Sequence, residues 1–331
     1  MSTSDSNCKD GSKDVVCEIN NKLQKLNTND TEVIVCANCG KESSSDNMNV
    51  CNKCKMVEYC NASCKKKHRS KHKKACEEYQ RRVAELHDEK LFKQPPPKED
   101  CPICFLRMPT LDMGWRYFSC CGKRICNGCI HAPLYDNQGN IVDNQKCPFC
   151  RTPGSTSEEV VLDREKKRME ANDPIAIFNI GNYYRDRRNG FPQDYNKALE
   201  LYNRSGELGN AQAFNSIGVL YDNGEGVEVD KKKARHYYEL AAMGGNLSAR
   251  HNLGNLELLA GNLDRALKHH MIAIRSGQNN SLNVIKMLYS RGHAPKEIYT
   301  LALQSYQEYL GEIKSSQRDE AAVADEDNRY Y

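Results

Sequence analysis

The sequence predicts a multidomain protein in which two small cysteine-rich modules precede an all-α solenoid of helical-hairpin repeats. All cysteines except Cys8 and Cys17 fall between Cys36 and Cys150, mostly in C-x2-C pairs. The second half of the chain contains none, and instead repeats a pattern of small and aromatic residues with a period of about 36 residues. The chain of 331 residues is also long enough for two or three compact units.

The 17 cysteines are expected to be metal ligands rather than disulfide partners. Residues 1–30 are polar and lack the apolar segment of a signal peptide, and no run of about 18 apolar residues occurs anywhere. We therefore expect an intracellular protein of the cytoplasm or nucleus, with no membrane partner. Closely spaced cysteines in a reducing compartment are typical of zinc sites. We interpret residues 1–30 as a disordered tail in which Cys8 and Cys17 are free thiols.

Charge gives little reason to expect nucleic-acid binding. The 48 Lys and Arg residues nearly balance the 44 Asp and Glu residues. Seven basic residues cluster between Lys65 and Lys74, but no aromatic residues alternate with them to stack on bases. We interpret this run as the solvated face of a helix or a localisation signal, so a nucleic-acid partner is the less favoured alternative.

The first cysteine cluster contains eight candidate ligands, enough for two tetrahedral zinc ions. About 40 residues this polar cannot fold on apolar burial alone, so bound metal must supply the stability. The candidates, in chain order, are Cys36, Cys39, Cys51, Cys54, Cys60, Cys64, His72 and Cys76. His72 and Cys76 are four residues apart and would share one face of a helix.

This order of ligands resembles a MYND finger, which we place at residues 31–77. The resemblance implies a cross-braced fold in which Cys36, Cys39, Cys60 and Cys64 hold one zinc ion and Cys51, Cys54, His72 and Cys76 hold the other. It also implies proline-containing peptides as partners, although Arg69 stands where the family usually has tryptophan. His68 we interpret as a surface residue of the helix. Residues 78–98 are expected to form a helix and a Pro-rich linker.

The second cluster, in residues 99–153, resembles a RING finger of the C4C4 type. The resemblance implies two further zinc ions in an irregular α+β fold that typically serves ubiquitin ligases. One ion is assigned to Cys101, Cys104, Cys126 and Cys129, and the other to Cys120, Cys121, Cys147 and Cys150. Lys123 stands in the central turn, where many RING fingers have a histidine ligand, and a protonated lysine cannot bind zinc. Cys120 therefore takes that place, with His131 as the less favoured alternative.

The RING resemblance also implies a groove for a ubiquitin-conjugating enzyme. It places Ile103 and Pro148 in that groove, and Arg151 matches the cation that contacts ubiquitin and the conjugating enzyme in active members. No residue of this chain is expected to act as a catalytic nucleophile.

Residues 154–172 are expected to form a linker, and residues 173–312 a solenoid. Asp194, Ala198, Tyr202 and Gly209 recur as Asp230, Ala234, Tyr238 and Gly245. Small residues at such positions let antiparallel helices pack closely. The repeats resemble SEL-like repeats, relatives of tetratricopeptide repeats, which implies protein binding by an unknown partner. A packed helical domain without a ligand groove is the alternative. Residues 313–331 are interpreted as a disordered acidic tail.

Two functions remain open on the sequence. The first is a RING-type ubiquitin ligase whose MYND finger and repeats recruit the substrate, and the second is a non-catalytic zinc-finger adaptor. Ile103, Pro148 and Arg151 distinguish the two, because an adaptor does not need an apolar groove beside a cation. A methyltransferase is excluded, because no remaining segment could form a catalytic domain of about 100 residues.

Overall fold

The computed structural model describes residues 34–43, 49–95, 99–110, 114–132, 146–155, 157–325 and 328–329. The chain divides into two compact units, Met1–Leu91 and Phe92–Tyr331, which are described separately. The tail predicted for residues 1–30, with Cys8 and Cys17, lies outside the described residues. No helix in the described part of the chain combines the length and apolar character needed to cross a membrane.

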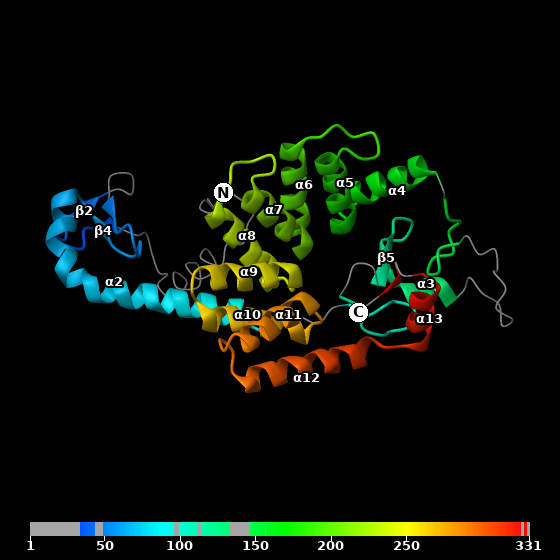
Figure 1. The fold of residues 1–331 in the computed structure, drawn as a ribbon. Helices are drawn as coiled ribbons and strands as arrows, with labels where there is room; N and C mark the ends of the chain where they lie inside the picture. Colours follow the sequence, from blue (N-terminus) through cyan, green and yellow to red (C-terminus); the bar gives the residue numbers. More distant parts are fainter. Residues whose placement is uncertain are drawn as a thin grey trace. The chain divides into compact units, whose positions relative to one another are not determined.

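The first unit consists of two short hairpins and one long helix (Figure 1). Strand β1 (Ile34–Val35) pairs antiparallel with β2 (Glu42–Ser43), and β3 (Asn49–Val50) pairs with β4 (Glu58–Tyr59). Helix α2 (Ala62–Leu91) then runs for 30 residues and continues past the predicted boundary at residue 78 without interruption. Among the described residues of this unit, the buried hydrophobic ones apart from Leu91 are Cys36, Cys54, Tyr59 and Cys76. A core made mostly of cysteines indicates that metal binding stabilises the fold.

The second unit begins with a small finger. Strand β5 (Trp115–Phe118) pairs antiparallel with β6 (Lys123–Cys126), and helix α3 (Asn127–His131) follows directly. Its core contains Met108 and Ile125 together with four of the predicted ligand cysteines.

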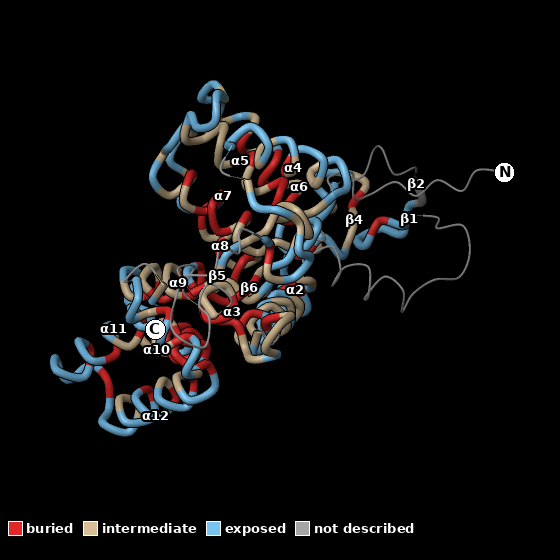
Figure 2. The backbone as a smooth tube through the Cα atoms, turned by 90° about the vertical axis from the view of Figure 1, so that its right-hand side faces the viewer, coloured by how far each residue is buried: buried red, intermediate tan, exposed pale blue. Residues whose placement is uncertain are grey.

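The remaining helices are those of the repeat region and one flanking helix at each of its ends, α4 before it and α13 after it. They are α4 (Glu158–Glu170), α5 (Pro174–Asp186), α6 (Tyr195–Glu207), α7 (Ala211–Asn223), α8 (Lys231–Met243), α9 (Leu247–Leu259), α10 (Leu263–Arg275), α11 (Asn279–Ser290), α12 (Lys296–Ile313) and α13 (Ser316–Ala324). Helices α5 and α6, α7 and α8, and α9 and α10 pack as hairpins, and each hairpin contacts the next. Figure 2 shows buried residues alternating with exposed ones along these helices. The predicted fold class, small cysteine-rich modules followed by a helical solenoid, is confirmed.

Capping residues and glycines explain the period of the repeats. The side chains of Asp194 and Asp230 cap the N-termini of α6 and α8, where they accept hydrogen bonds from backbone N–H groups. Tyr202 and Tyr238, eight residues further on in each case, are buried. Gly218 of α7 faces the second of these rings, and a Cβ atom there would lie 2.6 Å from Tyr238 Cδ1. The repeated residues are therefore those that start the helices and let them approach closely.

The linker predicted for residues 154–172 is instead largely helical. Helix α4 packs against α5, and its Glu165 is buried, accepting hydrogen bonds from Asn179 Nδ2 at 3.0 Å and from the Tyr183 hydroxyl at 2.7 Å. A helix is recognised in a sequence by apolar residues at helical spacing, and this helix instead buries a carboxylate that is satisfied by polar partners. The linker prediction was wrong for this reason.

The disordered tail predicted for residues 313–331 is likewise wrong over residues 316–324. These residues form α13, whose N-terminus is capped by Ser315. Helix α13 packs on α3 of the finger, and its Arg318 is buried. The charged composition of these residues suggested that they are solvated. Arg318 is instead buried, and its guanidinium donates hydrogen bonds to carbonyl oxygens of the second unit.

Candidate metal centres and partner-binding surface

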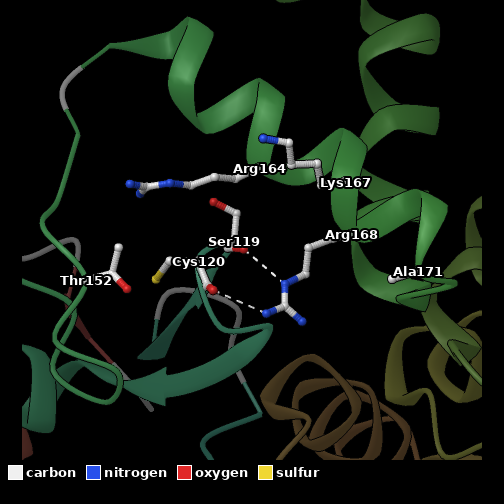
Figure 3. A pocket seen from close by; sticks show the side chains of 7 residues that line it. All are labelled: Ser119, Cys120, Thr152, Arg164, Lys167, Arg168 and Ala171. Carbon is white, nitrogen blue, oxygen red and sulfur yellow. Dashed lines mark hydrogen bonds between the residues drawn. The ribbon is translucent and has the colours of Figure 1, made fainter.

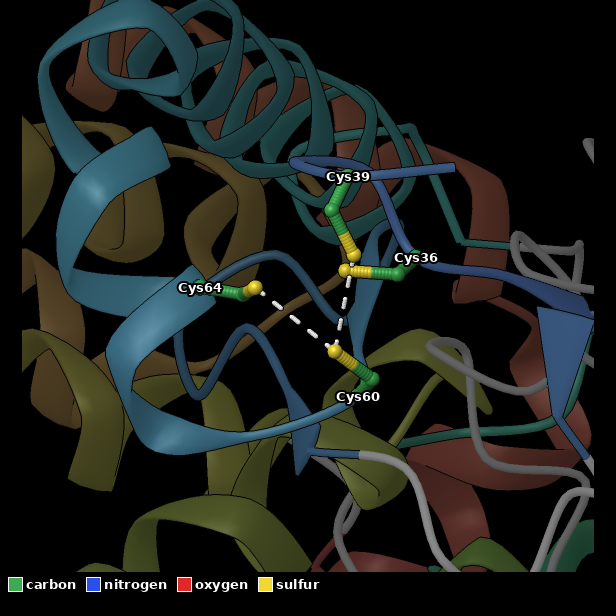
Figure 4. A group of neighbouring side chains, drawn as sticks. All are labelled: Cys36, Cys39, Cys60 and Cys64. Atoms are coloured by element: carbon green, nitrogen blue, oxygen red, sulfur yellow. Dashed lines mark hydrogen bonds between the residues drawn. The ribbon is translucent and has the colours of Figure 1, made fainter. Parts of the chain in front are cut away.

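All sixteen predicted ligands fall into four groups of four, grouped as predicted. Within each group the ligand atoms lie within 4.8 Å of one another. The groups are Cys36, Cys39, Cys60 and Cys64; Cys51, Cys54, His72 and Cys76; Cys101, Cys104, Cys126 and Cys129; and Cys120, Cys121, Cys147 and Cys150. Figure 4 shows the first group, whose four sulfur atoms converge on one point. In both fingers the groups alternate along the chain, as cross-bracing requires.

The spacing of the sulfur atoms fits tetrahedral zinc. Four thiolates at about 2.3 Å from a zinc ion place neighbouring sulfur atoms about 3.8 Å apart. The Sγ atoms of Cys39 and Cys60 are 3.6 Å apart, and those of Cys51 and Cys76 are 3.8 Å apart. A disulfide would bring two sulfur atoms to about 2 Å, and every described cysteine is free. The donor set therefore suits structural zinc with a closed ligand shell.

Helix α2 contributes ligands to both groups of the first finger. Asn61 Oδ1 accepts a hydrogen bond from the Cys64 N–H at 2.8 Å, which fixes the start of the helix beside the first group. One face of the same helix then presents His72, whose Nε2 lies 3.2 Å from Cys54 Sγ. Lys65, part of the basic run, donates to the carbonyl oxygen of Val50 at 2.7 Å and therefore has a structural contact.

Backbone donors favour the thiolate form of Cys36, whereas the neighbouring Cys64 thiol raises the pKa of Cys60. The pKa of Cys36 is lowered to about 6, mainly by the backbone N–H of Cys60.

His68 lies outside all four groups, and its Nδ1 is 3.3 Å from the hydroxyl of buried Tyr59.

Four of the five C-x2-C pairs, all except Cys126 and Cys129, form turns that share one backbone geometry. In each turn, the residue after the second cysteine has a positive φ, and its N–H donates to the carbonyl oxygen of the first cysteine. These residues are Gly40 (φ 73°), Lys55 (φ 55°), Phe105 (φ 56°) and Arg151 (φ 60°). Three are not glycine, and such a conformation persists in non-glycine residues only where the surroundings enforce it. The common turn indicates that both fingers present their cysteine pairs in the same way.

The central turn of the second finger brings Cys120 and Cys121 into the same group. Both lie at the turn of the β5–β6 hairpin, where Gly122 has a φ of 69°. Lys123 begins β6, and His131 ends α3 outside the four groups. Cys120 and Cys121 thus both belong to this group, and His131, the alternative for one of these two positions, does not.

Helix α4 holds this central turn against the repeat region. Arg168 donates to the carbonyl oxygens of Ser119 at 3.1 Å and Cys120 at 3.3 Å. The Tyr117 hydroxyl donates to Asp173, the residue that caps α5, at 2.8 Å. A pocket beside Cys120 is lined in part by Arg168 and by two further cations of α4, Arg164 and Lys167 (Figure 3).

The predicted partner-binding residues lie in two of the C-x2-C turns. Ile103 is half-buried and packs against the core of the finger. Pro148 is half-buried and Arg151 exposed, both in the turn that contains Cys147 and Cys150. Sequence reasoning missed two aromatic residues of the same turns, Phe105 and Phe149, which are 77% and 43% exposed. The sequence could have indicated them, because each is adjacent to a ligand cysteine.

Comparison with known families agrees with this division of the chain. Residues 36–76 match the family model of the MYND finger. These residues form a MYND finger. Residues 174–210 and 213–246 match the Sel1 repeat, which confirms the resemblance to SEL-like repeats. The RING-like assignment of residues 99–153 rests on the two cysteine groups alone.

Similar curated proteins include plant ubiquitin ligases. The chain is 38% identical over 73 residues to the E3 ubiquitin-protein ligase DA2 of Arabidopsis thaliana, and 36% identical over 73 residues to GW2 of Oryza sativa. It is 32% identical over 105 residues to HRD3B of A. thaliana, named as an ERAD-associated E3 ubiquitin-protein ligase component. These matches cover 22%, 22% and 31% of this chain, and each covers 16% of the relative.

Similar solved structures are repeat proteins. A Sel1 repeat protein from Oxalobacter formigenes is 26% identical with a TM-score of 0.42, over 53% of this chain and 68% of that one. A protective antigen of uropathogenic Escherichia coli is 24% identical with a TM-score of 0.41, over 52% of this chain and 38% of that one. The matches to the two family models, and not these structures, identify a zinc-finger protein with Sel1 repeats, and both are protein-interaction modules.

Proposed function

We propose that this chain is a RING-type ubiquitin-protein ligase whose MYND finger and Sel1 repeats recruit the substrate. The observation that carries the proposal is the interleaving of eight cysteines between residues 101 and 150 into two groups of four. The relatives named as ubiquitin ligases, or as a component of one, support the same class, although each match covers a small part of the relative.

The chemistry requires positioning rather than a nucleophile from this chain. Ubiquitin is carried as a thioester on the conjugating enzyme, and its carbonyl carbon passes to a substrate amine while the cysteine thiol leaves. Each zinc ion would have four protein ligands and so no open site to activate water. Ile103 and Pro148 would contact the conjugating enzyme, and Arg151, which is exposed, would contact enzyme and ubiquitin together.

A non-catalytic adaptor is the second candidate, and one observation favours it. The RING-like finger is fixed to the repeat region by α4 on one segment and by α13 on another. Such fixation suits a scaffold that holds two partners at a set distance. In this case the MYND finger and the repeats would bind proteins, including proline-containing peptides, without any transfer of ubiquitin.

The test is ubiquitin chain formation by the purified full-length protein across a panel of conjugating enzymes. The variants are Ile103→Ala and Arg151→Ala, with Arg116→Ala as the control for loss of an exposed arginine in the same finger. Truncating a hot-spot residue at the centre of an interface costs about 2 kcal/mol or more, and about 1.4 kcal/mol is a factor of ten, so we expect transfer to fall about tenfold or more in the first two variants.

Zinc content decides how the result is interpreted. Transfer that falls in Ile103→Ala and Arg151→Ala, but not in Arg116→Ala, at unchanged zinc content supports the ligase. Absence of transfer from fully zinc-loaded wild-type protein with every conjugating enzyme would refute the ligase and favour the adaptor.

A further inference from the structure

The end of the chain returns to the RING-like finger and contacts it at several points. Figure 1 shows α13 beside α3, in agreement with the packing of these two helices. Their backbones approach closely because Gly128 has no side chain, and a Cβ atom there would lie 2.9 Å from Arg318 Cγ. Helix α13 therefore packs closely on α3, the helix that contains the ligand Cys129.

Helix α12 reinforces this contact. Its Glu312 pairs with Arg107 of the finger. The hydroxyl of buried Tyr309 accepts a hydrogen bond from the Thr110 N–H at 2.8 Å, and Thr110 Oγ1 donates to the Ser276 carbonyl oxygen at 2.5 Å. The segment of the finger that follows Cys104 is therefore held in place by contacts with the C-terminal helices.

Arg318 is the unusual residue of this interface, because it is charged and only 1% exposed. Its Nη1 donates to the carbonyl oxygens of Arg107 at 2.9 Å and Ile313 at 2.6 Å. Its Nη2 lies 3.5 Å from the Leu106 carbonyl oxygen and 3.9 Å from Cys104 Sγ. In the part of the chain that the structure describes, no carboxylate pairs with this guanidinium.

A buried cation without a carboxylate partner is costly unless another negative charge offsets it. Carbonyl oxygens are neutral, which leaves the cysteine group that contains Cys104. Four thiolates around one Zn²⁺ carry a net charge of −2, so a zinc-loaded group would supply the missing negative charge.

We propose that Arg318 and helix α13 complete the metal site formed by Cys101, Cys104, Cys126 and Cys129. Arg318 acts as a positioning residue: it offsets part of the charge of the zinc–thiolate group and anchors the backbone after Cys104. Zinc binding and docking of α13 are then linked, so that each stabilises the other. The proposal concerns metal retention and does not depend on ubiquitin transfer.

The first experiment measures zinc transfer from the full-length protein to a chromogenic chelator. The variants are Arg318→Met, which removes the charge, and Arg318→Lys, which keeps it. Arg291→Met is the control for an exposed arginine outside the finger. Losing a partner of a metal ligand typically costs about 10-fold to 100-fold in affinity. We expect one zinc ion of Arg318→Met to leave at a correspondingly lower chelator concentration, with a smaller change in Arg318→Lys.

Alkylation of the released thiols, mapped by mass spectrometry, identifies the site. Early labelling confined to Cys101, Cys104, Cys126 and Cys129 supports the proposal. Equal release from Arg318→Met and wild type, or simultaneous release from all four groups, overturns it. If Arg318→Met does not fold, Glu312→Gln and Tyr309→Phe loosen the same contact without touching the sulfur atoms, and selective release is expected from them instead.

Hydrogen exchange gives an independent test on the wild-type protein. Removal of zinc should expose the backbone amides of residues 316–324 while those of α7 and α8 stay protected. Unchanged protection of residues 316–324 in the zinc-free protein overturns the linkage.

Discussion

Replacing Gly218 by alanine should destabilise the repeat region, although alanine is the better helix former. Gly181, Gly218 and Gly254 are equivalent residues of α5, α7 and α9. A Cβ atom on them would lie 2.8 Å from Tyr202, 2.6 Å from Tyr238 and 2.6 Å from His270 respectively. Each glycine therefore admits the ring from the second helix of its own hairpin.

Two opposing terms set the magnitude. Alanine gains about 1 kcal/mol over glycine inside a helix, whereas overpacking a closely filled interface costs about 1–3 kcal/mol. Tyr238 is 2% exposed and cannot move aside freely. We therefore expect the upper part of that range, and a net loss of about 1–2 kcal/mol. For a region of this size, each kcal/mol lowers the melting temperature by about 2–4 °C.

Thermal unfolding of the full-length protein, followed by helical circular dichroism, measures the effect. Gly311→Ala is the matched control, because a Cβ atom on this glycine of α12 meets nothing within 4 Å. That substitution should raise the melting temperature through helix propensity alone. A similar increase for Gly218→Ala would refute the close approach of α7 to Tyr238.

Three further outcomes are expected. Chelation of zinc should unfold residues 36–76 and leave the helices of the repeats intact, and hydrogen exchange showing residues 36–76 still protected without metal would contradict this. Lys55→Gly should raise zinc retention by the MYND finger in a chelator competition. A non-glycine residue at a φ of 55° costs about 1–2 kcal/mol, which exceeds the cost of about 0.5–1 kcal/mol for the greater flexibility of glycine. Weaker zinc retention by the variant would contradict this reasoning. Burial lowers the pKa of His269 and His270 to about 3 from 6.5, so below about pH 6.5 the unfolded chain binds protons that the folded chain does not. Stability should fall as pH decreases from 6.5 towards 3, and His270→Tyr, which restores the residue of the other repeats, should reduce the slope measured by exchange of α10 between pH 7 and 5; an unchanged slope would contradict this.

Ligand positions and repeat core positions could be predicted because both are encoded locally. The spacing between Cys101 and Cys104, or between His72 and Cys76, is set by one turn of backbone. The recurrence of Ala198 as Ala234, both fully buried, reflects the same helix contact in two successive hairpins. In such cases neighbouring residues determine the geometry, and a single sequence is enough.

The segments that pack around the RING-like finger could not be predicted, because their stabilising partners are distant and polar. Glu165 of α4 is buried and its hydrogen-bond partners lie on another helix, and Arg318 of α13 donates to the carbonyl oxygen of Arg107, 211 residues away in the chain. Charged residues at such positions are typical of solvated segments, so α4 was expected to be a linker and α13 a tail. Only the tertiary contacts show that these charges are satisfied internally.

The exposed aromatic residues beside the ligand cysteines bear on the choice between ligase and adaptor. Phe105 is 77% exposed and Phe149 is 43% exposed, each next to a cysteine whose position the metal would fix. Exposed phenylalanines reduce solubility, and metal-fixed turns hold them in place rather than letting them bury each other. A scaffold that used only the MYND finger and the repeats would gain nothing from them. A protein partner that docks on the two turns containing Ile103, Pro148 and Arg151 would cover both rings, and the ligase proposal requires a partner at these turns.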